Sequence, residues 1–93
     1  MSRALLPTAA FTRAAKRVAR RQPQVLQAIR ETLTRLEADA FDPQLRTHKL
    51  KGDLAETWSC SAGYDLRIVF DFVQHEGKEA ILLLSVGTHD EVY

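Results

Sequence analysis

The sequence is poor in cysteine, glycine and proline and has no long hydrophobic run. Its single cysteine, Cys60, excludes an intramolecular disulfide and a zinc site of paired thiolates, and we predict a small buried hydrophobic side chain there. Four glycines and three prolines leave no long linker, and neither a glycine-rich phosphate loop nor a nucleophile elbow is present. The longest apolar run, 80–84, is far below the roughly 18 residues of a membrane span, and Pro7 interrupts any signal-peptide core. We therefore predict one cytoplasmic domain, 1–93, with no membrane partner.

Acidic residues are absent from the first 21 positions, where six of the thirteen Lys and Arg residues lie. All twelve Asp and Glu residues follow. Arg13, Lys16, Arg17 and Arg20 recur at the spacing that aligns side chains on one helix face. Such a face predicts contact with nucleic acid or with an acidic protein, although many basic helix faces are simply hydrated.

The first half of the chain has helical periodicity. A helix is predicted over 8–21, with Thr8 as its N-cap. Its apolar positions are Phe11, Ala14, Ala15 and Val18. A second helix is predicted over 23–38, and its apolar seam consists of Leu26, Ile29, Leu33 and Leu36. Because only Arg21 and Gln22 separate the two, we expect an antiparallel hairpin.

The second half alternates between apolar and polar residues, as strands do. Strands are predicted over 56–61, 64–73 and 80–86, with turns at 62–63 and 74–79. The face of the second strand that should pack on the helices carries Leu66, Ile68, Phe70 and Phe72. The third run is apolar on both faces, which predicts a central strand beside which Leu5 and Leu6 could pair. The predicted fold class is α+β, with an N-terminal helical hairpin packed on one face of a small, mainly antiparallel β-sheet.

Polar side chains on the open sheet face are candidates for chemistry. Alternation makes Asp65 and Arg67 same-face neighbours on the strand 64–73. They could form a surface ion pair, or Arg67 could bind a phosphate while Asp65 orients it or an imidazole.

Two histidines are also predicted to reach this face. His48 opens a predicted basic loop that contains Lys49 and Lys51, and His89 follows the central strand. Two imidazoles at one site could act as general acid and base, whereas a single histidine is more often structural. No metal-ligand spacing joins His48 or His89 to another ligand, so neither a metal nor a cofactor is predicted.

Several segments resemble the RelE/ParE superfamily of small bacterial toxins, and within it the YafQ-like and RelE/StbE-type mRNA interferases. The segments that carry the resemblance are HKLKGDL at 48–54, WSC at 58–60, YDLRIVF at 64–70 and ILLLSVGTHDEVY at 81–93. The ending GTHDEVY is the most specific of them. The resemblance covers the whole chain and implies a microbial-RNase-like fold, cleavage of mRNA in the ribosomal A site, and a cognate antitoxin.

The resemblance also assigns roles to residues. His48 and His89 match two family histidines, Asp65 matches a strand carboxylate, Tyr93 matches a C-terminal aromatic residue, and Arg67 matches the strand arginine of RelE-type members. Other positions differ from the family. Ser61 stands where YafQ-like toxins have a second strand histidine, and Trp58 and Cys60 stand where RelE has lysines.

These matches imply metal-independent attack of the mRNA 2′-hydroxyl on the adjacent phosphate. His48 would be the base, His89 the acid and Asp65 the orienting group, although the two histidines could exchange roles. The residues expected to contact RNA are Arg67, Lys49 and Lys51 at the phosphate, Tyr93 at a base, and Arg13, Arg17 and Arg20 at ribosomal RNA or an acidic antitoxin. Two alternatives stay open, a ParE-like DNA gyrase inhibitor and a catalytically decayed antitoxin-binding protein.

Overall fold

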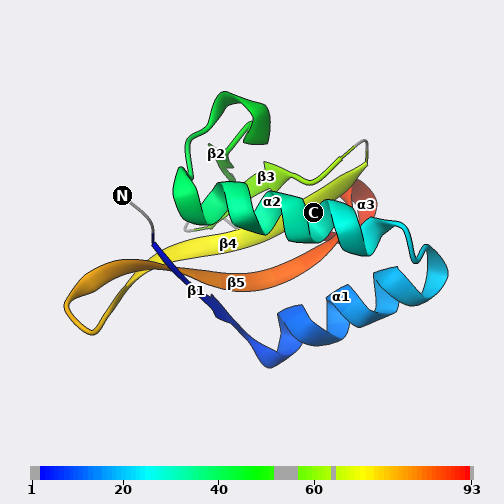
Figure 1. Ribbon diagram of the computed structural model, residues 1–93, viewed down its shortest axis with the longest axis horizontal. Coiled ribbons are helices and arrows are strands. Elements are labelled where there is room, and N and C mark those ends of the chain that lie inside the picture. Colours follow the sequence, from blue (N-terminus) through cyan, green and yellow to red (C-terminus); the bar gives the residue numbers. More distant parts are fainter. Residues whose placement is uncertain (1–2, 52–56, 64, 93) are drawn as a thin grey trace.

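The structure is a computed structural model that describes residues 3–51, 57–63 and 65–92. Along the chain its elements are β1 (Ala4–Pro7), α1 (Ala9–Arg21), α2 (Val25–Ala38), the 3-10 helix η1 (Pro43–Leu45), β2 (His48–Lys49), β3 (Trp58–Ser61), β4 (Leu66–His75), β5 (Lys78–Thr88) and α3 (His89–Val92). Within the described residues the strands form one sheet in the order β1-β5-β4-β3-β2. Only the β1–β5 pair of this sheet is parallel (Figure 1). This architecture confirms the predicted α+β fold.

The helical hairpin follows from its caps and its apolar faces. The Thr8 hydroxyl accepts a hydrogen bond from Phe11 N at 3.0 Å, which caps α1 as predicted, and donates one to Leu83 O at 2.8 Å. The chain reverses at Gln22, and α2 then runs back across the front of the sheet (Figure 1). Helix α2 begins at Val25, two residues later than predicted, because the bonds from Val25 N to Gln22 O and from Leu26 N to Pro23 O form a turn.

One apolar core joins the helices to the sheet. Its helical members are Phe11, Ala14, Val18, Ile29 and Leu36, and its strand members include Cys60, Ile68, Phe70, Ile81, Leu83 and Val86. The predicted seam of α2 is wrong at Leu26, which is 38% exposed because it lies in a groove between the two helices. Thr32 is buried instead, and its hydroxyl donates to Ala28 O at 2.8 Å.

A β-bulge lies within the predicted apolar run 80–86. In the pairing of β4 with β5, Val69 lies opposite Ser85 while Phe70 lies opposite Leu83, so Leu84 is an extra residue. The side chains that face the core therefore change from odd-numbered positions, such as Leu83, to even-numbered ones, such as Val86. As predicted, β5 is an interior strand, since β1 and β4 flank it.

The β4–β5 turn is shorter than the predicted range 74–79. Its central residues are Glu76 and Gly77, with φ values of 53° and 77°, and two positive φ values are what a type I′ hairpin turn requires. The turn places all ten residues of β4 in the ladder with β5. It lies at the opposite end of the hairpin from α3 (Figure 1).

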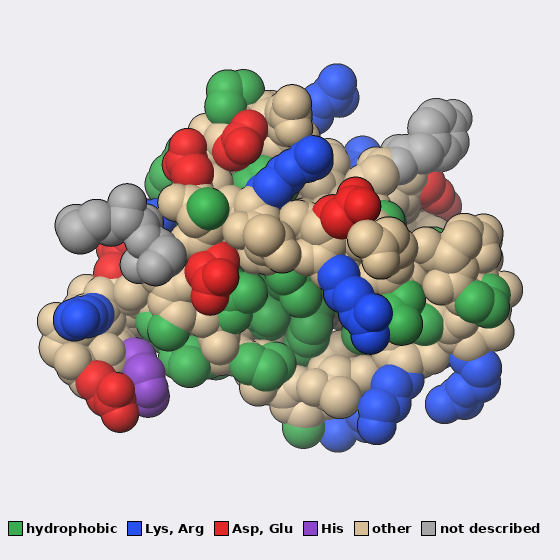
Figure 2. All heavy atoms as spheres, viewed as in Figure 1, with side chains coloured by type: hydrophobic (Ala, Val, Ile, Leu, Met, Phe, Trp, Pro, Cys, Tyr) green, Lys and Arg blue, Asp and Glu red, His purple; other side chains and the backbone are tan. Residues whose placement is uncertain are grey.

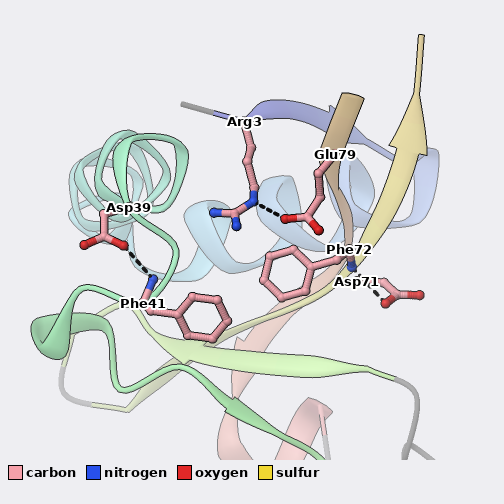
Figure 3. A network of polar contacts seen from close by, with 6 residues as sticks. All are labelled: Arg3, Asp39, Phe41, Asp71, Phe72 and Glu79. Carbon is pink, nitrogen blue, oxygen red and sulfur yellow. Dashed lines mark hydrogen bonds and ion pairs between the residues drawn. The ribbon is translucent and has the colours of Figure 1, made fainter. Parts of the chain in front are cut away.

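An aromatic cluster closes the core at that opposite end of the sheet. Phe41 stacks on Phe72 at 5.7 Å between ring centroids, and both rings meet Trp58 edge to face. The Arg3 guanidinium lies over the Phe72 ring and pairs with Glu79 at 2.5 Å (Figure 3). No helix in the described part of the chain has the length and apolar character that crossing a membrane requires.

Candidate functional site

Arg67 and His48 lie on the same face of the sheet, opposite the helices. Residues paired across strands share a face, and the register aligns His48 with Ser59, Ser59 with Val69, and Val69 with Ser85. Arg67 is two residues from Val69 and therefore points to that face. Since β3 separates β2 from β4 and Arg67 is two residues along β4 from Val69, the backbones of His48 and Arg67 are roughly 12 Å apart.

Arg67 lies on β4, the middle strand of the sheet. Along that strand it is near the end where α3 begins. Its register partners are Ser61 on β3 and Gly87 on β5. The half-buried side chain donates from Nη1 to Leu66 O at 3.1 Å. A guanidinium has five N–H donors, so this bond leaves donors that can bind a phosphate.

His48 belongs to a strand and not to the loop that was predicted. It pairs with Ser59 in β2, and Leu50 N extends the contact by donating to Thr57 O at 2.9 Å. The His48 Nδ1 atom is 3.0 Å from Arg46 O, and a carbonyl oxygen can only accept, so Nδ1 carries the proton. The lone pair of the neutral ring is then on Nε2, the atom that can take a proton from a substrate.

The two lysines of this segment are exposed, but Lys49 does not share the orientation predicted for it. Lys49 pairs with Trp58, which packs against the core, whereas His48 pairs with Ser59 on the opposite face. Alternation along a strand therefore turns Lys49 away from the face that carries His48. Lys51 is exposed two residues further on.

His89 is the first residue of α3, directly after the end of β5. Its side chain is exposed and it lies two residues beyond Gly87, the register partner of Arg67. His89 and Arg67 thus occupy the same end of the sheet. Tyr93, predicted to stack on a base, lies outside the described residues.

Asp65 is not part of the strand that was predicted to carry it. Gly63, at φ 108°, and a hydrogen bond from Ala62 N to Leu66 O at 2.8 Å form a tight bend, so β4 begins only at Leu66. Within the described ranges no ion pair joins Asp65 to Arg67. Asp65 instead lines a cavity of about 480 Å³ together with Arg21 at the end of α1 and with residues near α3.

Glu91 is a residue of this region that sequence reasoning missed. Its Oε1 atom accepts from Thr88 N at 2.9 Å, and its Oε2 atom accepts from Arg21 Nη2 at 2.6 Å. The bond from the Thr88 amide, and then the Arg21 guanidinium, lower the pKa of Glu91 below its ordinary value. The pattern Thr88-x-x-Glu91 is a capping box, a signal that could have predicted both α3 and Glu91.

A second surface lies along the basic helix. An apolar groove of about 700 Å³ runs between α1, α2 and β1, and its lining includes Leu5, Phe11, Leu26, Leu33 and Leu83. Lys16 and Arg20 also line it, and Arg13 and Arg17 are exposed on the same helix. Figure 2 shows the apolar patch beside a row of basic side chains. The stripe of exposed basic residues is as predicted.

The arrangement of helices and strands matches that of small toxins. E. coli YafQ superposes with a TM-score of 0.78 at 12% identity over 98% of each chain. The E. coli DinJ–YafQ toxin–antitoxin complex gives a TM-score of 0.76 at 13% identity, covering 100% of this chain and 99% of that chain. A conserved hypothetical protein of Helicobacter pylori gives a TM-score of 0.73 at 25% identity over 100% of both chains. No protein of curated function matches the sequence significantly.

The fold is therefore the one that YafQ and YoeB/ParE toxins have. Residues 3–93 match the family described as the bacterial toxin of type II toxin-antitoxin systems, YafQ. The chain belongs to this family and confirms the resemblance predicted from its sequence.

Proposed function

We propose that this toxin is a ribosome-dependent endoribonuclease that cleaves mRNA in the ribosomal A site without a metal. The observation that supports the proposal most strongly is the placement of His48, Arg67 and His89. Arg67 lies between the other two, with His48 on the β2 edge of the same face and His89 beyond the end of β5.

This order of groups suits transfer at phosphorus, in which the attacking and leaving oxygens lie roughly in line. The 2′-hydroxyl of the mRNA attacks the adjacent phosphorus while His48 Nε2 takes its proton. The bond from phosphorus to the 5′-oxygen breaks, and protonated His89 supplies a proton to that oxygen. Arg67 stabilises the negative charge that develops on the non-bridging oxygens. The products are a 2′,3′-cyclic phosphate and a 5′-hydroxyl.

Asp65, Lys49 and Lys51 have supporting roles in the proposal. Asp65 is in the bend before β4, at the end of the sheet where His89 lies, so it is better placed to orient His89 than His48. Lys51 and Lys49 are exposed cations next to His48 in the chain that attract RNA by their charge, although Lys49 points away from the face that carries His48. Tyr93 follows α3 directly in sequence and stays the proposed stacking platform for a base.

The function is tested by mapping cleavage of an mRNA in a translating bacterial extract by primer extension. His48→Ala and His89→Ala should each lower the cleavage rate about 10²- to 10⁴-fold, because each removes one proton transfer. His75→Ala is the matched control, since His75 lies at the β4–β5 turn at the other end of the sheet.

Wild-type rates in both site variants would contradict the proposed mechanism. Equal cleavage with and without ribosomes would contradict ribosome dependence. If the folded wild-type chain makes no cut, the same preparation should be tested for inhibition of DNA gyrase in a supercoiling assay. Inhibition there would favour the ParE-like alternative, and inactivity in both assays would favour a decayed toxin.

We also propose that the basic groove along α1 binds the cognate antitoxin. The groove combines an apolar floor with Lys16 and Arg20, which fits an amphipathic segment that carries acidic residues. DinJ forms a toxin–antitoxin complex with E. coli YafQ, whose chain has the same fold. The alternative ligand of this surface is ribosomal RNA.

Charge and apolar contributions to this binding can be separated. Replacing Arg13, Arg17 and Arg20 together by Gln should weaken antitoxin binding and reduce its dependence on salt, measured by calorimetry at low and high ionic strength. Leu26→Asp should weaken binding without changing the number of basic residues, because it places a carboxylate in the apolar groove. If both variants bind antitoxin like the wild type but lose affinity for ribosomes, the surface binds RNA.

A further inference from the structure

The C-terminal turn α3 is too short to be stable through its own hydrogen bonds. It has four residues, whereas isolated helices shorter than about 12 residues are marginal in water. Its position after β5 must therefore be fixed by contacts with the rest of the molecule. Those contacts decide where His89, its first residue, is held.

Glu91 makes two contacts that fix this turn. One carboxylate oxygen accepts from Thr88 N at 2.9 Å and so closes the first turn of α3 onto the end of β5. The other accepts from Arg21 Nη2 at 2.6 Å, which ties the turn to the last residue of α1. A single side chain thus links β5, α3 and the basic helix.

Close packing at Gly87 brings Glu91 and Val92 against the strand. A Cβ atom at Gly87 would lie 3.1 Å from Glu91 Cβ and 3.3 Å from Val92 Cγ1, both tighter than ordinary contact. Gly87 is also the register partner of Arg67. The turn is therefore packed against the strand position that lies beside the proposed phosphate-binding arginine.

We propose that Glu91 and Arg21 are positioning residues that hold α3 on the end of β5, so that His89 is kept at the Arg67 end of the sheet. This inference rests on the proposed function, in which His89 protonates the leaving oxygen. Neither residue needs to touch RNA. When the contact is broken, the turn leaves Gly87 and His89 loses its fixed distance to Arg67.

The test compares the effect of Glu91→Ala on the cleavage rate in three backgrounds. Glu91→Ala in the otherwise wild-type chain should lower single-turnover mRNA cleavage by about 10- to 100-fold, because displacement of a reacting group by about 1 Å can cost that much. In a His89→Ala background the same substitution should change the residual rate less than about twofold, since it acts only through His89. In a His48→Ala background its effect should be undiminished.

Two matched controls exclude general causes. Glu79 is another carboxylate that pairs with an arginine, Arg3, but it lies at the far end of β5 (Figure 3). Glu79→Ala should therefore leave the cleavage rate unchanged. Asp90→Asn removes a negative charge next to His89 without touching the Glu91 contacts and measures the effect of charge alone.

Arg21→Lys, which keeps one charged donor, should recover part of the cleavage rate lost in Arg21→Ala.

A second measurement tests the positioning itself and needs no activity. In NMR spectra, Glu91→Ala and Arg21→Ala should each shift the ring resonances of His89 and speed hydrogen exchange at the Thr88 amide, whereas Glu79→Ala should do neither. Unchanged His89 resonances in both variants would overturn the inference. So would an equal loss of cleavage in the wild-type and His89→Ala backgrounds, or no loss in either. If the wild-type chain cleaves no mRNA, the proposed function fails and the NMR result alone decides whether Glu91 and Arg21 position His89.

Discussion

Cys60 shows at the scale of one residue how the core controls reactivity. Its side chain has no exposed surface, and burial raises its pKa to about 12 although Arg67 acts in the opposite direction. Since the thiolate is the reacting form, the native thiol at pH 8 should be about 1,000-fold less ionised than one with the ordinary pKa of 9.0. We expect iodoacetamide to label Cys60 readily in guanidinium chloride and only very slowly in the native protein. Rapid labelling of the native protein, followed by mass spectrometry, would contradict this prediction.

The burial of apolar side chains could be predicted from the sequence. The orientation of residues next to a local backbone bend could not. The buried thiol of Cys60 followed from its apolar setting. Asp65 was assigned to a strand because alternation alone does not reveal the bend that Gly63 and the Ala62–Leu66 hydrogen bond create. Glu91 was missed because an exposed charged residue is usually only hydrated, whereas the exposed Glu91 accepts a bond from the Thr88 amide in a capping box.

At the scale of elements, the Thr8 hydroxyl joins the first helix to the sheet. It caps α1 through the amide of Phe11 and also donates to Leu83 O on β5. Thr8→Ala should therefore lower the free energy of unfolding by about 1 to 2 kcal/mol, measured by urea denaturation. Thr8→Ser keeps the hydroxyl and should recover most of that loss. An equal loss in both variants would show that the methyl group of Thr8, and not its hydroxyl, supplies the stability.

Long periodic elements were predicted well, and short ones required tertiary information. The helix 8–21 and the alternating strand before Val73 have enough residues for periodicity to be clear. Strand β2 has two residues and exists because β3 offers its backbone groups, so a local pattern could not reveal it. The β-bulge at Leu84 could not be predicted, because alternation in the sequence does not show where one residue is inserted into a ladder. The same limit applies to the candidate site, because the predicted pairing of Asp65 with Arg67 on one strand is wrong where β4 begins only at Leu66.

At the scale of the whole molecule, a single core joins the helical hairpin to the sheet, so both should unfold together. Trp58, the one tryptophan of the chain, packs against this core from β3, while circular dichroism at 222 nm reports mainly α1 and α2. Urea unfolding followed by Trp58 fluorescence and by circular dichroism should give the same midpoint.

Phe70→Ala should lower both midpoints equally, with a loss of about 3 to 5 kcal/mol, because Phe70 is completely buried in the middle strand of the sheet. Phe41→Ala, at a position 51% exposed, is the control and should cost much less. Earlier loss of the helical signal would contradict this cooperativity. It would also mean that the basic helix can separate from the strands, in which case the contact between Arg21 and Glu91 could not hold the C-terminal turn in place.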